Sequence, residues 1–228
     1  MIMVNEEQGG QPKKATFKRW VDDHKKISAI GLSVVLVAVV GLVWANHNSS
    51  KTAISKNPVI ANYQKQLPSL AAAVKKNGNN SQAHYDYAVA LYATGDTAKA
   101  KDQYEADLKI NPNNAVLQNN LGNVYRDLGD YQKSIDAYQK AISIDSKSVN
   151  PYINLANLYI YTLNKKDLGV KTFQQALQNL PGNQTIEVLL GVAYEQTGDK
   201  DSARQAYQTV LSADPSNVAA QAGIKRVQ

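Results

Sequence analysis

The sequence predicts an all-α chain made of repeated helix pairs, with one membrane-spanning helix ahead of them. Two observations support this prediction. Residues 115–148 form a 34-residue segment whose near copies lie on both sides, and residues 27–45 are 19 amino acids without a charge. Self-similarity at a fixed period of this length is typical of helical solenoids. An apolar run of about 20 residues is long enough to cross a bilayer as a helix.

The repeats become visible when their aromatic residues are aligned. One aromatic residue marks the second helix of each unit, with spacings of 34, 35 and 34 residues: Tyr104, Tyr138, Phe173 and Tyr207. These spacings predict four units, at residues 81–114, 115–148, 149–183 and 184–217. The third unit is one residue longer, and we expect its extra residue in the turn 162–166 between the two helices.

Each unit also carries a small residue in its first helix, where a partner helix can approach closely. These residues are Ala88, Gly122, Ala156 and Gly191. A single helix pair cannot bury its apolar stripe alone, so the units are expected to stack on one another and form one continuous core.

The segment 115–148 resembles a tetratricopeptide repeat (TPR). The residues that carry the resemblance are Leu121, Gly122, Tyr125, Gly129, Tyr131, Tyr138 and Ala141. The resemblance covers residues 81–217, about 60% of the 228 residues, and implies a right-handed α-solenoid of TPR helix hairpins. The sequence departs from the family pattern at Asp107, where an alanine is expected, and at the position that is often Trp. That position holds His84, Gln118, Tyr152 and Glu187.

The N-terminal part predicts a single-pass membrane protein. Residues 1–26 form a basic tail, residues 27–45 a transmembrane anchor and residues 46–57 a polar linker. Six Lys or Arg residues lie in the 15 positions before the apolar run and two in the 15 after it, so the positive-inside rule places the tail in the cytoplasm and the repeats outside it. A cleaved signal peptide is the alternative, because Val43-Trp44-Ala45 is a tolerable cleavage site.

Both ends of the repeat array are expected to be capped. Residues 58–80 predict N-terminal capping helices, and residues 218–228 predict a short C-terminal capping helix. Such caps present a polar face where the stack ends.

Charge and composition exclude several classes of function. Residues 1–80 contain 11 Lys/Arg and 4 Asp/Glu, a net charge of +7, whereas residues 81–228 contain 14 and 15, a net charge of −1. A nucleic-acid groove along the repeats is therefore not expected. There is no cysteine, and the three histidines lie far apart in the sequence. We expect no catalytic residues, no metal and no cofactor, and hence no enzyme.

The most distinctive polar residues are asparagines in the first helices of units two and three. The resemblance to TPR proteins implies that this side of the first helix lines a concave groove in which asparagines hold extended peptide backbones. We therefore predict a peptide-binding groove lined by Tyr85, Asn119, Asn120, Asn123, Ile153, Asn154, Asn157 and Tyr161. An amide side chain offers a donor and an acceptor, which matches a peptide backbone without reading its sequence. The alternatives are a solvated face, or asparagines that bond to neighbouring helices. The family's clamp for a C-terminal carboxylate is not matched, because Tyr85, Asn150 and Asn154 stand where it needs Lys and Arg.

Two functions follow from this organisation. The first is a membrane-anchored scaffold that holds an extended polypeptide outside the cytoplasm during secretion or envelope assembly. The second is a structural adaptor that docks one folded partner, as in cell division or pilus assembly. The first is similar in organisation to bacterial membrane-anchored TPR proteins that assist secretion or envelope assembly.

Overall fold

A computed structural model describes residues 57–228 of the chain, and this range is entirely helical, without a strand. The chain divides into a unit at residues 1–57 and a unit at residues 58–228. The predicted tail 1–26 and anchor 27–45 lie outside the described residues, as does all but the last residue of the linker 46–57. Within the described range, no helix is long and apolar enough to span a membrane.

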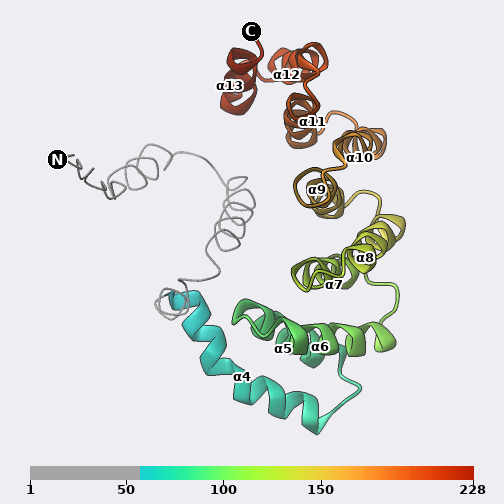
Figure 1. Cartoon of the computed structure of the whole chain (residues 1–228). Helices are drawn as coiled ribbons and strands as arrows, with labels where there is room; N and C mark the ends of the chain where they lie inside the picture. The colour runs from blue at the N-terminus through green and yellow to red at the C-terminus, as the bar shows by residue number, and fades with distance from the viewer. Residues whose placement is uncertain (1–56) are drawn as a thin grey trace, which may run out of the picture. The chain divides into compact units, whose positions relative to one another are not determined.

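Ten α-helices and one π-helical turn follow one another in residues 58–228, and each helix packs against its neighbours in the sequence (Figure 1). The helices are α4 (Pro58–Lys76), α5 (Ser81–Ala93), α6 (Thr97–Ile110), α7 (Ala115–Asp127), α8 (Tyr131–Ile144), α9 (Val149–Asn157), η1 (Leu158–Thr162), α10 (Lys166–Asn179), α11 (Gln184–Thr197), α12 (Lys200–Ala213) and α13 (Val218–Arg226). Each of the four units 81–114, 115–148, 149–183 and 184–217 therefore contains one helix hairpin. The prediction of an all-α solenoid is confirmed.

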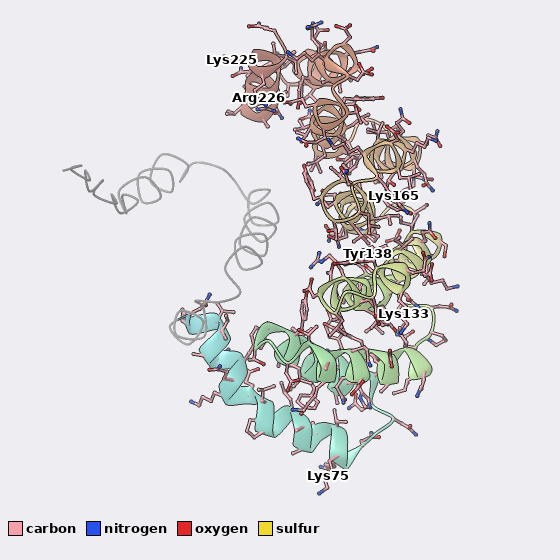
Figure 2. All side chains as sticks on the ribbon, viewed as in Figure 1. Lys75, Lys133, Tyr138, Lys165, Lys225 and Arg226 are labelled. Carbon is pink, nitrogen blue, oxygen red and sulfur yellow. The ribbon has the colours of Figure 1, made fainter. Side chains whose placement is uncertain are left out.

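The core is built where a second-helix aromatic ring packs on a small residue of the first helix. A Cβ atom added at Gly122 would lie 2.5 Å from Cε1 of Tyr138, and one added at Gly191 would lie 2.6 Å from Cε1 of Tyr207. Both tyrosine side chains are fully buried, and Tyr138 is labelled in Figure 2. The predicted close approach at the small residues is thus confirmed at these two positions.

Asparagines at the unit boundaries begin the first helices. The side-chain oxygens of Asn80, Asn114, Asn183 and Asn217 each accept a hydrogen bond from the backbone N–H three residues later, at 3.0–3.1 Å. This is N-capping, which satisfies a backbone donor that has no partner within the helix. Ser148 stands at the same place before α9 but makes no such bond with its side chain.

The turn between the two helices needs a left-handed residue in every unit. Gly95, Gly129 and Gly198 have φ angles of 89°, 83° and 86°, and Asn164 has a φ angle of 52° in unit three. Glycine adopts this conformation without steric cost, and asparagine is among the few other residues that tolerate it. Asn164 is therefore the turn residue of unit three.

The extra residue of unit three lies earlier than the turn 162–166 in which the sequence analysis expects it. In unit two, Leu128 N–H donates to Val124 O, four residues back, whereas Leu163 N–H donates to Leu158 O, five residues back. The chain takes up the additional residue as the π-helical turn η1. A π-bulge of this kind keeps the backbone hydrogen-bonded, so the insertion does not leave buried N–H groups without partners.

Gly169 of unit three is not a turn residue. It lies inside α10, and a Cβ atom there would lie 2.3 Å from Cγ1 of Ile160 in η1. It therefore admits the displaced side chain of the π-helical turn.

The two residues of unit one that depart from the family pattern, Asp107 and His84, are both buried and both hydrogen-bonded. Asp107 is 1% exposed, and its carboxylate accepts a hydrogen bond from the Ser81 hydroxyl. Burial raises the pKa of Asp107, although the Ser81 hydrogen bond and the charge of His84 both oppose that rise. His84 is itself buried, with Nδ1 2.8 Å from Gln103 Oε1 and Nε2 3.0 Å from the Gly78 carbonyl oxygen. A polar residue with a hydrogen-bonding partner thus stands where units two and three have the buried Ala141 and Ala176.

At the N-terminal end of the repeats, residues 58–80 form one helix, α4, and a turn, rather than more than one helix. No residue of α4 is fully buried, and Leu67 packs against the core of unit one. At the other end, α13 presents Ala220 and Gly223 to the interior, and Gly223 admits the ring of Tyr207.

Candidate functional site

Hydrogen bonds between the first helices of successive units create one continuous polar face. Tyr92 OH in α5 donates to Asp127 Oδ2 in α7, Asn120 Nδ2 in α7 lies 3.4 Å from Tyr85 OH in α5, and Asn154 Nδ2 in α9 donates to Asn119 Oδ1 in α7 at 2.8 Å. All three pairs are 35 residues apart in the sequence. Polar side chains that are one repeat and one residue apart in the sequence therefore meet where neighbouring first helices pack together. We call this surface the first-helix face.

The Asn119–Asn154 pair is the centre of this face. Both side chains are half-buried. Because Asn154 donates to Asn119, the NH₂ group of Asn119 and the side-chain oxygen of Asn154 take no part in that bond. An amide has two donor hydrogens and two acceptor lone pairs. The pair thus retains a donor group on Asn119 and an acceptor atom on Asn154 that the bond between the two helices does not use, and a peptide unit needs one of each.

Tyr85 and Asn120 form the N-terminal end of the predicted groove. The Tyr85 ring packs edge-on against Tyr104, with centroids 6.1 Å apart and planes at 66°. Tyr104 is buried, so this contact fixes the position of a half-buried ring on the first-helix face. Edge-to-face pairs of this kind are favourable beyond the area that they bury.

Asn123 has a structural role in addition to its position on the first-helix face. Its side-chain oxygen accepts a 2.7 Å hydrogen bond from Tyr138 OH, the buried tyrosine of unit two. Burial raises the pKa of Tyr138 to about 12, so this hydroxyl stays protonated and acts as the donor. Asn157, at the equivalent position in unit three, is half-buried and makes no side-chain hydrogen bond within the described part of the chain. The two asparagines share a helix position but differ in their bonding.

Apolar side chains border the amides toward the C-terminal end. Ile153 is half-buried against the core of unit three, and the side chain of Tyr161 in η1 is 60% exposed. Val188 and Val192 of α11 are half-buried as well. The predicted residues thus lie in α5, α7, α9 and η1, and the structure joins Tyr85 to Asn120 and Asn119 to Asn154 directly.

A charged cluster that the sequence analysis did not identify closes this end of the repeats. Arg226 of α13 contacts Glu195 of α11 through two nitrogens, Nε at 3.0 Å and Nη2 at 2.8 Å. Tyr207 OH also donates to Glu195. The hydrogen bond from Arg226 lowers the pKa of the Glu195 carboxyl, and the hydrogen bond from Tyr207 lowers it further. Arg226 and Glu195 are 31 residues apart, a separation that no helix or repeat period predicts. The pair is therefore visible only once the packing of α13 against α11 is known.

The described residues hold no cluster of three or more His, Asp or Glu side chains suited to a metal ion. Every buried side-chain nitrogen and oxygen in that range has a hydrogen-bond partner. The polar groups offered to a ligand are therefore those on the surface, and on the first-helix face they are mainly amides and hydroxyls.

Four family profiles match the repeats. Profiles described as tetratricopeptide repeat match residues 81–114, 104–136 and 169–226, and one described as TPR repeat matches residues 122–160. The chain carries tetratricopeptide repeats. The resemblance seen in the sequence is confirmed for the repeats, and the profiles match no part of residues 1–80.

Solved structures share the TPR fold at low sequence identity. The MamA protein is 18% identical, with a TM-score of 0.59 over 71% of this chain and 88% of that chain. YrrB, described as a TPR protein with an unusual peptide-binding site, is 18% identical, with a TM-score of 0.53 over 69% and 81%. The C-terminal part of a TPR protein from Cytophaga hutchinsonii is 17% identical, with a TM-score of 0.64 over 73% and 65%. No curated protein sequence matches the chain.

Proposed function

We propose that this protein is a membrane-anchored TPR scaffold that holds extended polypeptide on its first-helix face, outside the cytoplasm. The observation that carries the proposal is the Asn119–Asn154 pair, which joins two repeats and still offers a donor and an acceptor. An extended peptide presents its N–H and C=O groups at regular intervals. Amides repeated from unit to unit match that pattern without requiring a particular sequence.

The charges near the first-helix face support a ligand bound through its backbone. Arg126 pairs with Asp127 at 2.8 Å, and Arg226 pairs with Glu195 at 2.8 Å. Cations that are already paired are poor receptors for a terminal carboxylate, so the face favours an internal segment of a chain over a chain end. The fold is shared with YrrB, whose description as a TPR protein with an unusual peptide-binding site supports the same type of ligand.

The binding test compares one triple variant of the full chain with a single-substitution control. Asn119→Ala, Asn154→Ala and Asn157→Ala together remove the amides of the face, while the exposed Asn113, in the connection between units one and two, provides a control through Asn113→Ala. We expect each lost amide to cost about 0.5–1.5 kcal/mol of binding free energy toward unfolded peptides of unrelated sequence. The three together do not have to add, because they contact one ligand.

The outcome separates the proposal from its alternatives. Fluorescence anisotropy with a panel of unfolded peptides should show the same loss for every peptide, with no loss in the Asn113→Ala control. Equal binding by the triple variant and the wild type would refute the proposed site. Binding to one folded partner only, with no affinity for the panel, would favour a structural adaptor in a cell-division or pilus-type assembly.

The membrane part of the proposal rests on the sequence. The apolar run 27–45 and the excess of Lys and Arg before it support a retained anchor with an N-terminus in the cytoplasm. A reporter that is active only after export, fused behind Gln228, should be active. An inactive reporter would refute the orientation, and a mature N-terminus at Asn46 would show a cleaved signal peptide instead.

A further inference from the structure

The turn of unit three differs from the turns of the other units in charge. Units one, two and four place Asp96, Asp130 and Asp199 directly before the second helix, and unit three places Lys165 there. Asp199 accepts a capping hydrogen bond from Ser202 N–H, whereas Lys165, like Asp96 and Asp130, makes no side-chain capping hydrogen bond. An acidic residue at this position complements the positive end of the helix dipole, and a lysine opposes it. Unit three therefore gives up a local stabilising interaction that its neighbours keep.

Three lysines lie close together at this position. Lys165, Lys166 and Lys171 line an open cleft of about 640 Å³ between the start of α10 and the end of α11. None of the three forms an ion pair in the part of the chain that the structure describes, where the salt bridges lie elsewhere. By contrast, Lys99 and Lys133 in units one and two pair with the turn aspartates at 2.7 Å and 3.2 Å (Lys133 and Lys165 are labelled in Figure 2).

The remaining lining of the cleft suits a polypeptide. Asp167 is the acidic residue among the lining side chains, which leaves a net charge of +2. Leu168 is 38% exposed and adds an apolar contact, and Gln196 and Thr197 add polar side chains from the end of α11. An open surface with cations, one apolar side chain and hydrogen-bonding groups is complementary to a short acidic segment of a protein.

We propose that this cleft, which we call the lysine cleft, is a second docking site that binds an acidic segment of a partner protein. Its lining includes none of the predicted groove residues, and the proposal goes beyond the function proposed above. Uncompensated lysines at a helix start cost stability, and interactions of that kind are retained where they serve binding. The carboxylates of the partner would supply the counter-ions that Asp96 and Asp130 supply in the other units.

The test uses the full chain and a short fluorescent peptide rich in glutamate with one leucine, together with its glutamine analogue. The wild type should bind the glutamate peptide more tightly than the glutamine analogue, and salt should weaken the binding. The triple variant Lys165→Gln, Lys166→Gln and Lys171→Gln should lose about tenfold or more in affinity, as expected for lost charge-assisted hydrogen bonds. The control triple Lys99→Gln, Lys133→Gln and Lys140→Gln changes the net charge equally and should retain the affinity.

A single substitution distinguishes docking from a structural role. Lys165→Asp restores the residue type found in the other turns, so it should raise the melting temperature and at the same time weaken binding of the glutamate peptide. The groove variant with Asn119, Asn154 and Asn157 replaced by alanine should bind the glutamate peptide as the wild type does. Equal binding of both peptides, equal losses in the two lysine triples, or binding to anionic phosphatidylglycerol vesicles without binding to the peptide would each refute the proposal.

Discussion

Units two and three have equivalent buried residues, but the turns between their helices differ. Tyr138 in unit two and Phe173 in unit three are both buried second-helix rings, 35 residues apart. Their turns, however, differ in three respects, because unit three contains a π-helical turn, a left-handed Asn164 and an unpaired Lys165. The comparison teaches that stacking restricts the buried positions, whereas the turns can change in length and charge without disturbing it. Differences between units are therefore the place to look for function.

The largest effect should follow from removing a shared core residue. Tyr138→Ala deletes a fully buried ring that fills the space beside Gly122. We expect a loss of about 3–5 kcal/mol in the free energy of unfolding, as for other large aromatic truncations. Denaturant unfolding of the variant and the wild type measures this difference. A loss below about 1 kcal/mol would show that the ring is not part of the inter-repeat core.

A smaller effect should separate the two equivalent asparagines. Asn123→Ala leaves the hydroxyl of Tyr138 without its 2.7 Å acceptor, so it should cost about 1–3 kcal/mol of stability. Asn157→Ala removes a half-buried side chain that makes no such bond, and its cost should stay within about 0.5 kcal/mol. Thermal unfolding of the two single variants tests the difference. Equal losses would mean that the Tyr138–Asn123 hydrogen bond contributes nothing to stability.

The sequence predicts the repeats well because every unit repeats the same steric requirements. Aromatic spacing locates Tyr104, Tyr138, Phe173 and Tyr207, and all four are buried. The insertion in unit three is visible as a spacing of 35, but a spacing places no residue within a segment, and the structure assigns it to η1 rather than to the turn. Alignment of Asn164 and Lys165 with the Gly-Asp pairs of the other turns would have revealed the charge reversal.

The candidate site is predicted less completely. Periodicity groups Asn119, Asn120 and Asn123 on one helix, but it does not reveal which amides bond to the core and which to a neighbouring repeat. The 35-residue pairs arise from the offset between stacked helices, which is a property of the packing. The Glu195–Arg226 pair likewise depends on how α13 packs against α11.

The smallest effect concerns the C-terminal end and depends on pH. The Arg226 guanidinium lowers the pKa of Glu195, so this pair stabilises the fold above the ordinary glutamate range and loses its contribution as the pH falls through the lowered pKa. Since both side chains are partly exposed, Arg226→Gln should cost about 0.2–1 kcal/mol at neutral pH. The difference between variant and wild type should disappear in acid. A difference that persists at low pH would show that Arg226 acts through packing instead.

The most direct test of the first-helix face is photo-crosslinking of the full chain in membranes. A photoreactive amino acid at position 157 places the probe on the face, and the same probe at position 113 places it in an exposed connection between units. We expect position 157 to crosslink to many exported chains of unrelated sequence, and position 113 not to. Equal crosslinking from both positions, or a single stoichiometric partner at position 157, would contradict binding of extended polypeptide on this face.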